Sequence, residues 1–209
     1  GKPQLVCSAS GRLVAFDPAN GQRLWELEGL SNNTSSTPIP AGEGRFFIGA
    51  SDGRGEPKPG ATNSNGLVQV TLQANGSYQA DFLWRAEKAS CSFGSPIVAD
   101  GRVWFVNRSG ALYQLDLETG KQLGLSRVKC GGIWATPLCD GRNLFFFGQK
   151  GTTSVVSLET GEELAANELW EVPTEAVGEP AMNSHVQYAA ATVDGLLLIR
   201  RGDKLFAIR

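Results

Sequence analysis

The chain has 209 residues, of which 41% are hydrophobic and 19% charged, a composition that predicts a folded domain and excludes a disordered chain. Its net charge of -2 and the lack of any basic run argue against nucleic acid as a partner. Its apolar runs are far shorter than the roughly 20 residues of a membrane span, and the first 30 residues contain no signal-peptide pattern.

Frequent turns dominate the composition. The chain contains 26 glycines and 10 prolines, many of them at the borders of short apolar runs. No amphipathic helical stripe extends over 11 residues, so the pattern predicts an all-β protein. The segment "GEELAANELWEV" at 161–172 has a helix-forming composition, but its position in the repeat described below predicts a strand.

The first predicted unit, residues 4–30, contains the clearest hairpin of the chain, "AFDPANGQRLW" at 15–25. An apolar strand leads to Asp17, a turn forms around Asn20-Gly21, and the next strand carries Trp25. Asp and Gly suit this turn because the carboxylate accepts from nearby backbone amides and glycine tolerates positive φ. We expect Trp25 to pack on the neighbouring unit, since such a ring buries roughly 150–250 Å².

Similar units follow at 34–88, 91–128 and 130–172, and the last unit, 179–209, ends after its third strand. Three pairs of residues define the period: Pro96 and Pro137 are 41 apart, Gly101 and Gly141 are 40 apart, and Gly120 and Gly161 are 41 apart. Four strands are predicted in the third unit, at 95–99, 102–107, 111–117 and 121–128.

Four antiparallel strands that recur about every 41 residues are typical of a β-propeller blade. The sequence therefore predicts an all-β, partial ring of about four to five four-stranded blades, three complete and two incomplete at the termini. We expect residues 1–209 to form a single propeller segment, the C-terminal half of a larger ring. Open edge strands at its ends would favour self-association.

The repeat resembles the PQQ-like repeat of the quinoprotein-alcohol-dehydrogenase-like β-propellers over nearly the whole chain. Residues Ala15, Asp17, Gly21 and Trp25 match the tryptophan-docking motif of that family. The later units depart from the motif. Trp84 comes four residues late in the second unit, Gly124 stands at the tryptophan position of the third, and Trp170 is delayed by five residues in the fourth.

Two insertions are candidate binding segments. The first, 52–66, lies between the second and third strands of its unit, and the second, 172–185, precedes the first strand of the last unit. Loops of this length are either decoration or partner-binding elements, and both interpretations stay open. The second insertion carries the only histidine, His185, whose nearest carboxylates are Glu175 and Glu179; we expect a structural role for it.

The four cysteines lack the spacing of a zinc or redox motif. Cys91 and Cys130 both precede first strands of adjacent units, which allows a disulfide between them. We expect Cys7 and Cys139, which fall within predicted strands, to be small buried side chains.

A quinone dehydrogenase would need a stacking platform, a cluster of acidic and amide ligands for calcium, and, by the resemblance, often two adjacent cysteines. The sequence has no adjacent cysteines, and Trp104 and Trp134 are expected in the core. It therefore predicts no catalytic, cofactor-binding or metal-binding residue and no cofactor. Four asparagines open N-x-S/T triplets, which are weak signals here: Asn32, Asn33, Asn75 and Asn107.

The resemblance implies a non-catalytic scaffold or binding module with a protein or polysaccharide partner, like the family members that serve bacterial outer-membrane barrel assembly. It also implies a location outside the cytoplasm, in the periplasm or at the cell surface. Two alternatives remain: a fragment of a PQQ-dependent dehydrogenase, and the sensor domain of a signalling protein. Fold analogy alone does not decide among them.

Overall fold

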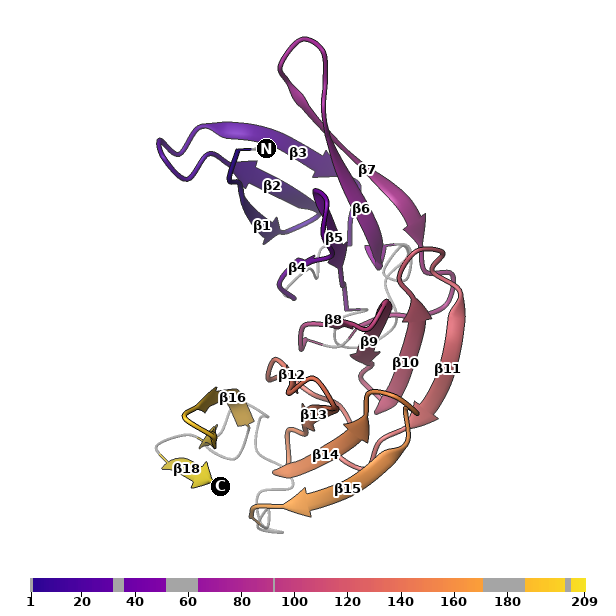
Figure 1. Cartoon of the computed structure of the whole chain (residues 1–209), viewed down its shortest axis with the longest axis vertical. Helices are drawn as coiled ribbons and strands as arrows, with labels where there is room; N and C mark the ends of the chain where they lie inside the picture. The colour runs from indigo at the N-terminus through magenta and orange to yellow at the C-terminus, as the bar shows by residue number, and fades with distance from the viewer. Residues whose placement is uncertain (1, 32–35, 52–63, 92, 171–186, 202–203) are drawn as a thin grey trace.

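The computed structural model describes residues 2–31, 36–51, 64–91, 93–170, 187–201 and 204–209. These residues form 18 β-strands in five antiparallel sheets. The sheets follow one another around an open arc and do not close into a ring (Figure 1). The predicted all-β architecture of propeller blades is thus confirmed. No helix that could span a membrane is formed by the residues that the structure describes.

Each sheet is called a blade here and is numbered in chain order. Blades 1 and 5 have three strands: β1 (Leu5–Ala9), β2 (Arg12–Phe16) and β3 (Arg23–Glu28); β16 (Gln187–Val193), β17 (Leu196–Arg201) and β18 (Lys204–Ile208). Blade 2 contains β4 (Ile39–Pro40), β5 (Arg45–Ile48), β6 (Gly66–Leu72) and β7 (Tyr78–Arg85). Blade 3 contains β8 (Ile97–Ala99), β9 (Arg102–Val106), β10 (Ala111–Asp116) and β11 (Gln122–Arg127). Blade 4 contains β12 (Leu138–Cys139), β13 (Asn143–Phe147), β14 (Thr152–Ser157) and β15 (Glu163–Glu168).

Each complete blade is a meander whose first strand lies on the concave side of the arc and whose fourth strand lies on the convex side (Figure 1). The strands predicted at 95–128 correspond to β8–β11. The segment 161–172 contains strand β15, as the repeat predicts, because pairing with β14 outweighs its helix-forming composition.

Two-residue turns set the register of the first hairpins. Asp100 and Gly101 both have positive φ, 51° and 66°, as a type I′ turn requires, and they connect β8 to β9. Asp194 and Gly195 repeat this conformation between β16 and β17. These two Asp-Gly pairs therefore form hairpin turns of this type.

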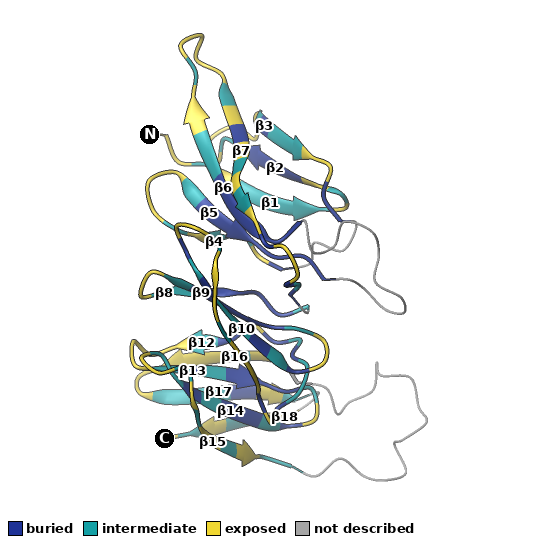
Figure 2. Cartoon of the chain, turned by 90° about the vertical axis from the view of Figure 1, so that its right-hand side faces the viewer, coloured by how far each residue is buried: buried dark blue, intermediate teal, exposed yellow. Residues whose placement is uncertain are grey.

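The apolar cores lie between blades, because the buried side chains belong to the facing sides of neighbouring sheets. The second and third strands hold most of the buried residues, whereas the fourth strands are largely exposed (Figure 2). Trp25 of blade 1 stacks on Phe46 of blade 2 with ring centroids 5.9 Å apart, which confirms that this ring packs across the gap. Trp170 stacks in the same way on Phe206 of blade 5, at 5.4 Å.

The altered docking motifs of blades 2 and 3 are compensated by other contacts with the next blade. In blade 2 the late Trp84 still reaches blade 3, where its Nε1 donates to the Leu117 carbonyl oxygen over 2.9 Å. In blade 3 a side chain at Gly124 would lie 2.8 Å from Oε1 of Gln114. Trp104 of the same blade packs instead toward the turn glycine of blade 4, Gly161. A ring from the second strand thus fills the place expected for one from the fourth.

All four cysteines are free, so the disulfide considered between Cys91 and Cys130 is not formed. Both of these thiols are buried, and burial raises the pKa of each. The expectation that Cys7 and Cys139 are buried was wrong: Cys7 is half-buried and Cys139 is exposed. Cys139 ends a two-residue inner strand and lines the groove between blades 4 and 5.

Equivalent turn glycines make a matched test of the contact between blades. Gly21 and Gly120 have φ of 74° and 70°, but an added Cβ meets nothing within 4 Å at Gly21, whereas at Gly120 it would overlap the Trp84 ring. Gly21→Ala should cost roughly 1–2 kcal/mol for the left-handed backbone alone. Gly120→Ala should cost roughly 1–3 kcal/mol more, because the ring must move. Urea denaturation of both variants measures this difference, and equal losses would contradict Trp84 docking.

The exposure of the cysteines predicts an order of reaction with a thiol reagent such as DTNB. In the native protein one thiol, Cys139, should react rapidly, and Cys139→Ser should remove that phase. Cys91 should react only after the protein unfolds, because its thiol is buried and its pKa is raised. Rapid labelling of Cys91 in the native state, read by mass spectrometry, would contradict the packing between blades 2 and 3.

Candidate binding surfaces

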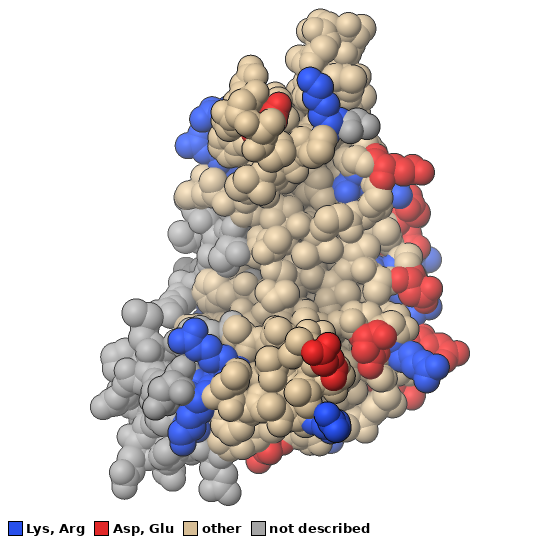
Figure 3. All heavy atoms as spheres, turned by 60° about the vertical axis from the view of Figure 1, so that its left-hand side comes forward, with Lys and Arg blue, Asp and Glu red and all other residues tan. Residues whose placement is uncertain are grey.

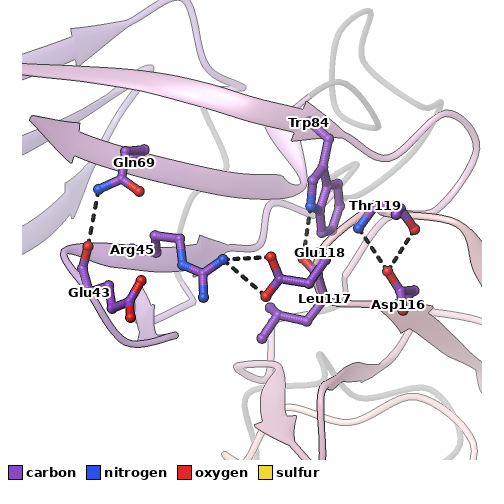
Figure 4. Close-up of polar contacts among 8 residues, drawn as sticks. All are labelled: Glu43, Arg45, Gln69, Trp84, Asp116, Leu117, Glu118 and Thr119. Carbon is purple, nitrogen blue, oxygen red and sulfur yellow. Dashed lines mark hydrogen bonds and ion pairs between the residues drawn. The ribbon is translucent and has the colours of Figure 1, made fainter.

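Polar contacts join neighbouring blades at the face that carries the first hairpins. Arg45 lies at the start of β5 and forms an ion pair with Glu118 of blade 3. Its Nη1 donates to both carboxylate oxygens, over 3.0 and 2.7 Å (Figure 4). Arg102 holds the equivalent place at the start of β9, and its Nη1 donates to the carbonyl oxygens of Leu158 and Glu159 in blade 4, over 3.2 and 3.1 Å. In two blades, therefore, an arginine at the start of the second strand contacts a turn of the next blade.

The repeated aspartate forms that turn. Asp116 Oδ1 accepts from the backbone N–H of Thr119 over 2.8 Å and from its hydroxyl over 2.6 Å (Figure 4). The hydroxyl hydrogen bond lowers the pKa of Asp116 most, followed by the backbone hydrogen bond. Asp17 accepts similarly from the Ala19 N–H. The aspartate of the motif therefore acts as a turn former.

The concave surface is uncharged where the first strands lie. The segments 36–41, 93–99 and 133–139 contain no charged residue. Figure 3 shows an uncharged stretch across the middle of the surface, with Asp, Glu, Lys and Arg along its right-hand edge and over its lower part. The inner strands are linked sideways: the Ser8 hydroxyl donates to the Ser36 carbonyl oxygen over 2.9 Å, and the Thr37 N–H donates to the Ser95 hydroxyl over 3.0 Å.

The chain leaves the sheets for the two insertions at the ends of β5 and β15, opposite the first hairpins of their blades. Residues 52–63 and 171–186, including His185, lie outside the described residues. The root of the first insertion is fixed by Asn65, whose Oδ1 accepts from the N–H groups of Ala50 and Cys91 over 2.9 and 3.1 Å. Its Nδ2 donates back to the Ala50 carbonyl oxygen over 3.1 Å. One buried amide thus ties both ends of the insertion to the following blade.

The described residues line three grooves that follow gaps between blades. They lie between blades 1 and 2, blades 4 and 5, and blades 2 and 3, with volumes of about 720, 660 and 440 Å³. The second is mostly apolar and is lined by side chains such as Phe145, Leu197 and Ile208. The third, on the convex side, is the most polar of the three. Sequence reasoning missed all three, since each groove combines residues of two units.

The two tryptophans expected in the core differ in burial. Trp104 is 1% exposed and enclosed between blades 3 and 4, so it cannot be a platform for a flat cofactor. Trp134 is half-buried and packs edge-on against Phe93, with centroids 5.5 Å apart. In the part of the chain that the structure describes, no three His, Cys, Asp or Glu side chains gather as metal ligands. The described residues do not fit a PQQ–calcium site.

Two of the N-x-S/T asparagines have structural roles. Asn75 Oδ1 accepts from the backbone N–H and hydroxyl of Ser77, over 3.0 and 2.7 Å. Asn107 Oδ1 accepts from the same two groups of Ser109, both over 2.9 Å. Both asparagines therefore shape tight turns. Asn32 and Asn33 fall outside the described residues.

Comparison with known proteins agrees with this architecture. A family described as outer membrane protein assembly factor BamB matches residues 1–123, more than half of the chain. The crystal structure of BamB from Moraxella catarrhalis superposes with a TM-score of 0.67 at 17% sequence identity, covering 98% of this chain and 57% of that chain. The chain thus spans little more than half the length of that protein, and at this identity the likeness concerns the fold. Curated proteins gave no match. On the strength of the family match, the chain belongs to the PQQ-like repeat family of outer membrane protein assembly factor BamB.

Proposed function

We propose that this chain is a non-catalytic scaffold that binds a protein partner through its loop-bearing face, outside the cytoplasm in the bacterial periplasm. The observation that carries the proposal is the membership of the BamB family. In the described part of the chain, charged side chains such as Arg45 and Asp116 form turns and contacts between blades. A polysaccharide partner is the alternative that the experiment below must distinguish.

The topology supports one particular face. In a four-stranded meander, the connection between the second and third strands lies at the same end of the sheet as the connection to the next blade. The first insertion joins β5 to β6, and the second joins β15 to β16. Both therefore leave the sheets at one face, and the Asn65 hydrogen bonds hold the root of the first in place. Recognition segments on a rigid frame lose less entropy on binding.

We also propose that the arc is a segment of a larger ring, its C-terminal half. The five sheets do not close, and the alignment covers 57% of the Moraxella catarrhalis BamB chain. Further strands would pair with the outer edges of β1 and β18, which are unpaired among the described residues, and further blades would cover the outer faces of blades 1 and 5.

The proposed function predicts specific capture of envelope proteins that depends on the insertions. The chain, immobilised and cross-linked in a bacterial envelope extract, should retain a reproducible set of proteins identified by mass spectrometry. Replacing residues 52–63 by a short Gly-Ser linker should reduce that capture at least fivefold, because the partner loses one of its two contact segments.

A matched control shortens a loop at the other face: the Gln73–Ser77 hairpin tip is replaced by an Asn-Gly turn. This variant should capture the same proteins as the parent chain. Capture that survives the 52–63 replacement unchanged would remove that insertion from the proposal. No protein capture at all, or retention that disappears after polysaccharide digestion of the extract, would contradict a protein scaffold.

A further inference from the structure

The groove between blades 2 and 3 differs from the other two in its charge. It lies on the convex side, between the end of β7 with the segment that follows and the turn that precedes β11, and has a volume of about 440 Å³. That is within the range of roughly 300–1,000 Å³ typical of ligand pockets. All of its lining residues are described, and it lies away from both ends of the arc.

Its walls are held by a contact within blade 2 and by contacts between blades 2 and 3. The Ala86 N–H donates to the Asn65 carbonyl oxygen over 2.7 Å, which fixes the segment after β7. On the other side Trp84 packs against the turn at Gly120 and donates to the Leu117 carbonyl oxygen (Figure 4). Because both walls belong to strand ends and hydrogen-bonded turns, the groove is formed before any ligand arrives.

Three cations and one carboxylate line it: Arg85, Lys88, Lys121 and Glu87. The Arg85 guanidinium lies 3.7 Å from the centroid of the Phe82 ring, which orients it. Burial lowers the pKa of Arg85, as expected for a cation that has given up part of its hydration. The local excess of positive charge contrasts with the net charge of -2 of the whole chain.

The floor of the groove is apolar. Ala86, Ala89 and Leu115 are 3%, 4% and 2% exposed. A cationic rim above an apolar floor suits an anion carried on a short hydrocarbon stem, since the stem covers the floor while the charge meets the rim. Inorganic phosphate lacks the stem, and a sugar acid presents hydroxyl groups to a floor that cannot bind them.

We propose that this groove is a recognition site for an acidic side chain, glutamate or aspartate, on an exposed segment of a protein partner. The proposal rests on the proposed function, of which it names one contact and the charge of the partner. Lys88 and Lys121 meet the carboxylate as flexible point charges, and Arg85 adds its positive charge to the rim.

The test uses fluorescently labelled hexaglutamate and hexaglutamine peptides and follows anisotropy with the full chain. Hexaglutamate should bind saturably, and more weakly as salt rises. The double variant Lys88→Glu/Lys121→Glu should bind at least tenfold more weakly. Lys150→Glu, an exposed charge change on blade 4, should alter binding less than twofold. Unchanged circular dichroism and urea midpoints show that the variants are folded.

Several outcomes overturn the site. The first is the absence of saturable hexaglutamate binding. The others are binding of hexaglutamine as tight as that of hexaglutamate, and a loss of affinity in Lys150→Glu as large as in Lys88→Glu/Lys121→Glu. Tighter binding of polygalacturonate or inorganic phosphate than of hexaglutamate would assign the groove to another ligand. The assay uses no envelope extract, so its failure leaves the capture experiment standing, whereas failed capture with intact peptide binding would reject the scaffold function.

Discussion

Burial of both faces of a thin sheet is the constraint on which this structure depends. A single four-stranded blade cannot bury two apolar faces by itself, so each blade needs a neighbour. Aromatic rings bridge the gaps: Trp25 meets Phe46, Trp84 meets the Gly120 turn, and Trp170 meets Phe206. Arginines at the starts of β5 and β9 add polar contacts to the turn of the next blade. The stability of the structure therefore depends on the repeated interface between blades, and not on each blade alone.

This constraint also explains how much of the fold could be predicted. The 41-residue period, the Asp-Gly turns and the alternation of short apolar runs are local signals, and they identify the strands of blade 3 and even overrule the helix-forming composition of 161–172. In contrast, the replacement of a missing ring by a ring from another strand does not appear in the sequence of any single strand. Gly124 looks like a lost motif, yet Trp104 from another strand supplies a ring to the same interface. No pattern within one strand reveals such an exchange.

The errors on cysteines and the missed grooves have the same origin. Burial of a residue in a propeller depends on the next blade, which is some 41 positions away in sequence. Cys91 is buried because blades 2 and 3 close over it, whereas Cys139 is exposed where blades 4 and 5 leave a groove. The acidic-side-chain site likewise combines Arg85 with Lys121, which belong to different units. The turn-forming role of Asp17 was easier to predict, because its partner Ala19 is only two residues away.

Neighbouring blades stabilise each other through their shared interface. Hydrogen–deuterium exchange of the parent chain and of the Trp104→Ala variant tests this most directly. Trp104 is a residue of blade 3 that packs with Leu144, Phe146 and Val156 of blade 4. If the interface holds both sheets, the substitution should raise exchange in β13 and β14 as well as in β9 and β10, while β2 and β3 of blade 1 keep their protection. Faster exchange confined to blade 3 would show that blades are stable alone and would contradict the account.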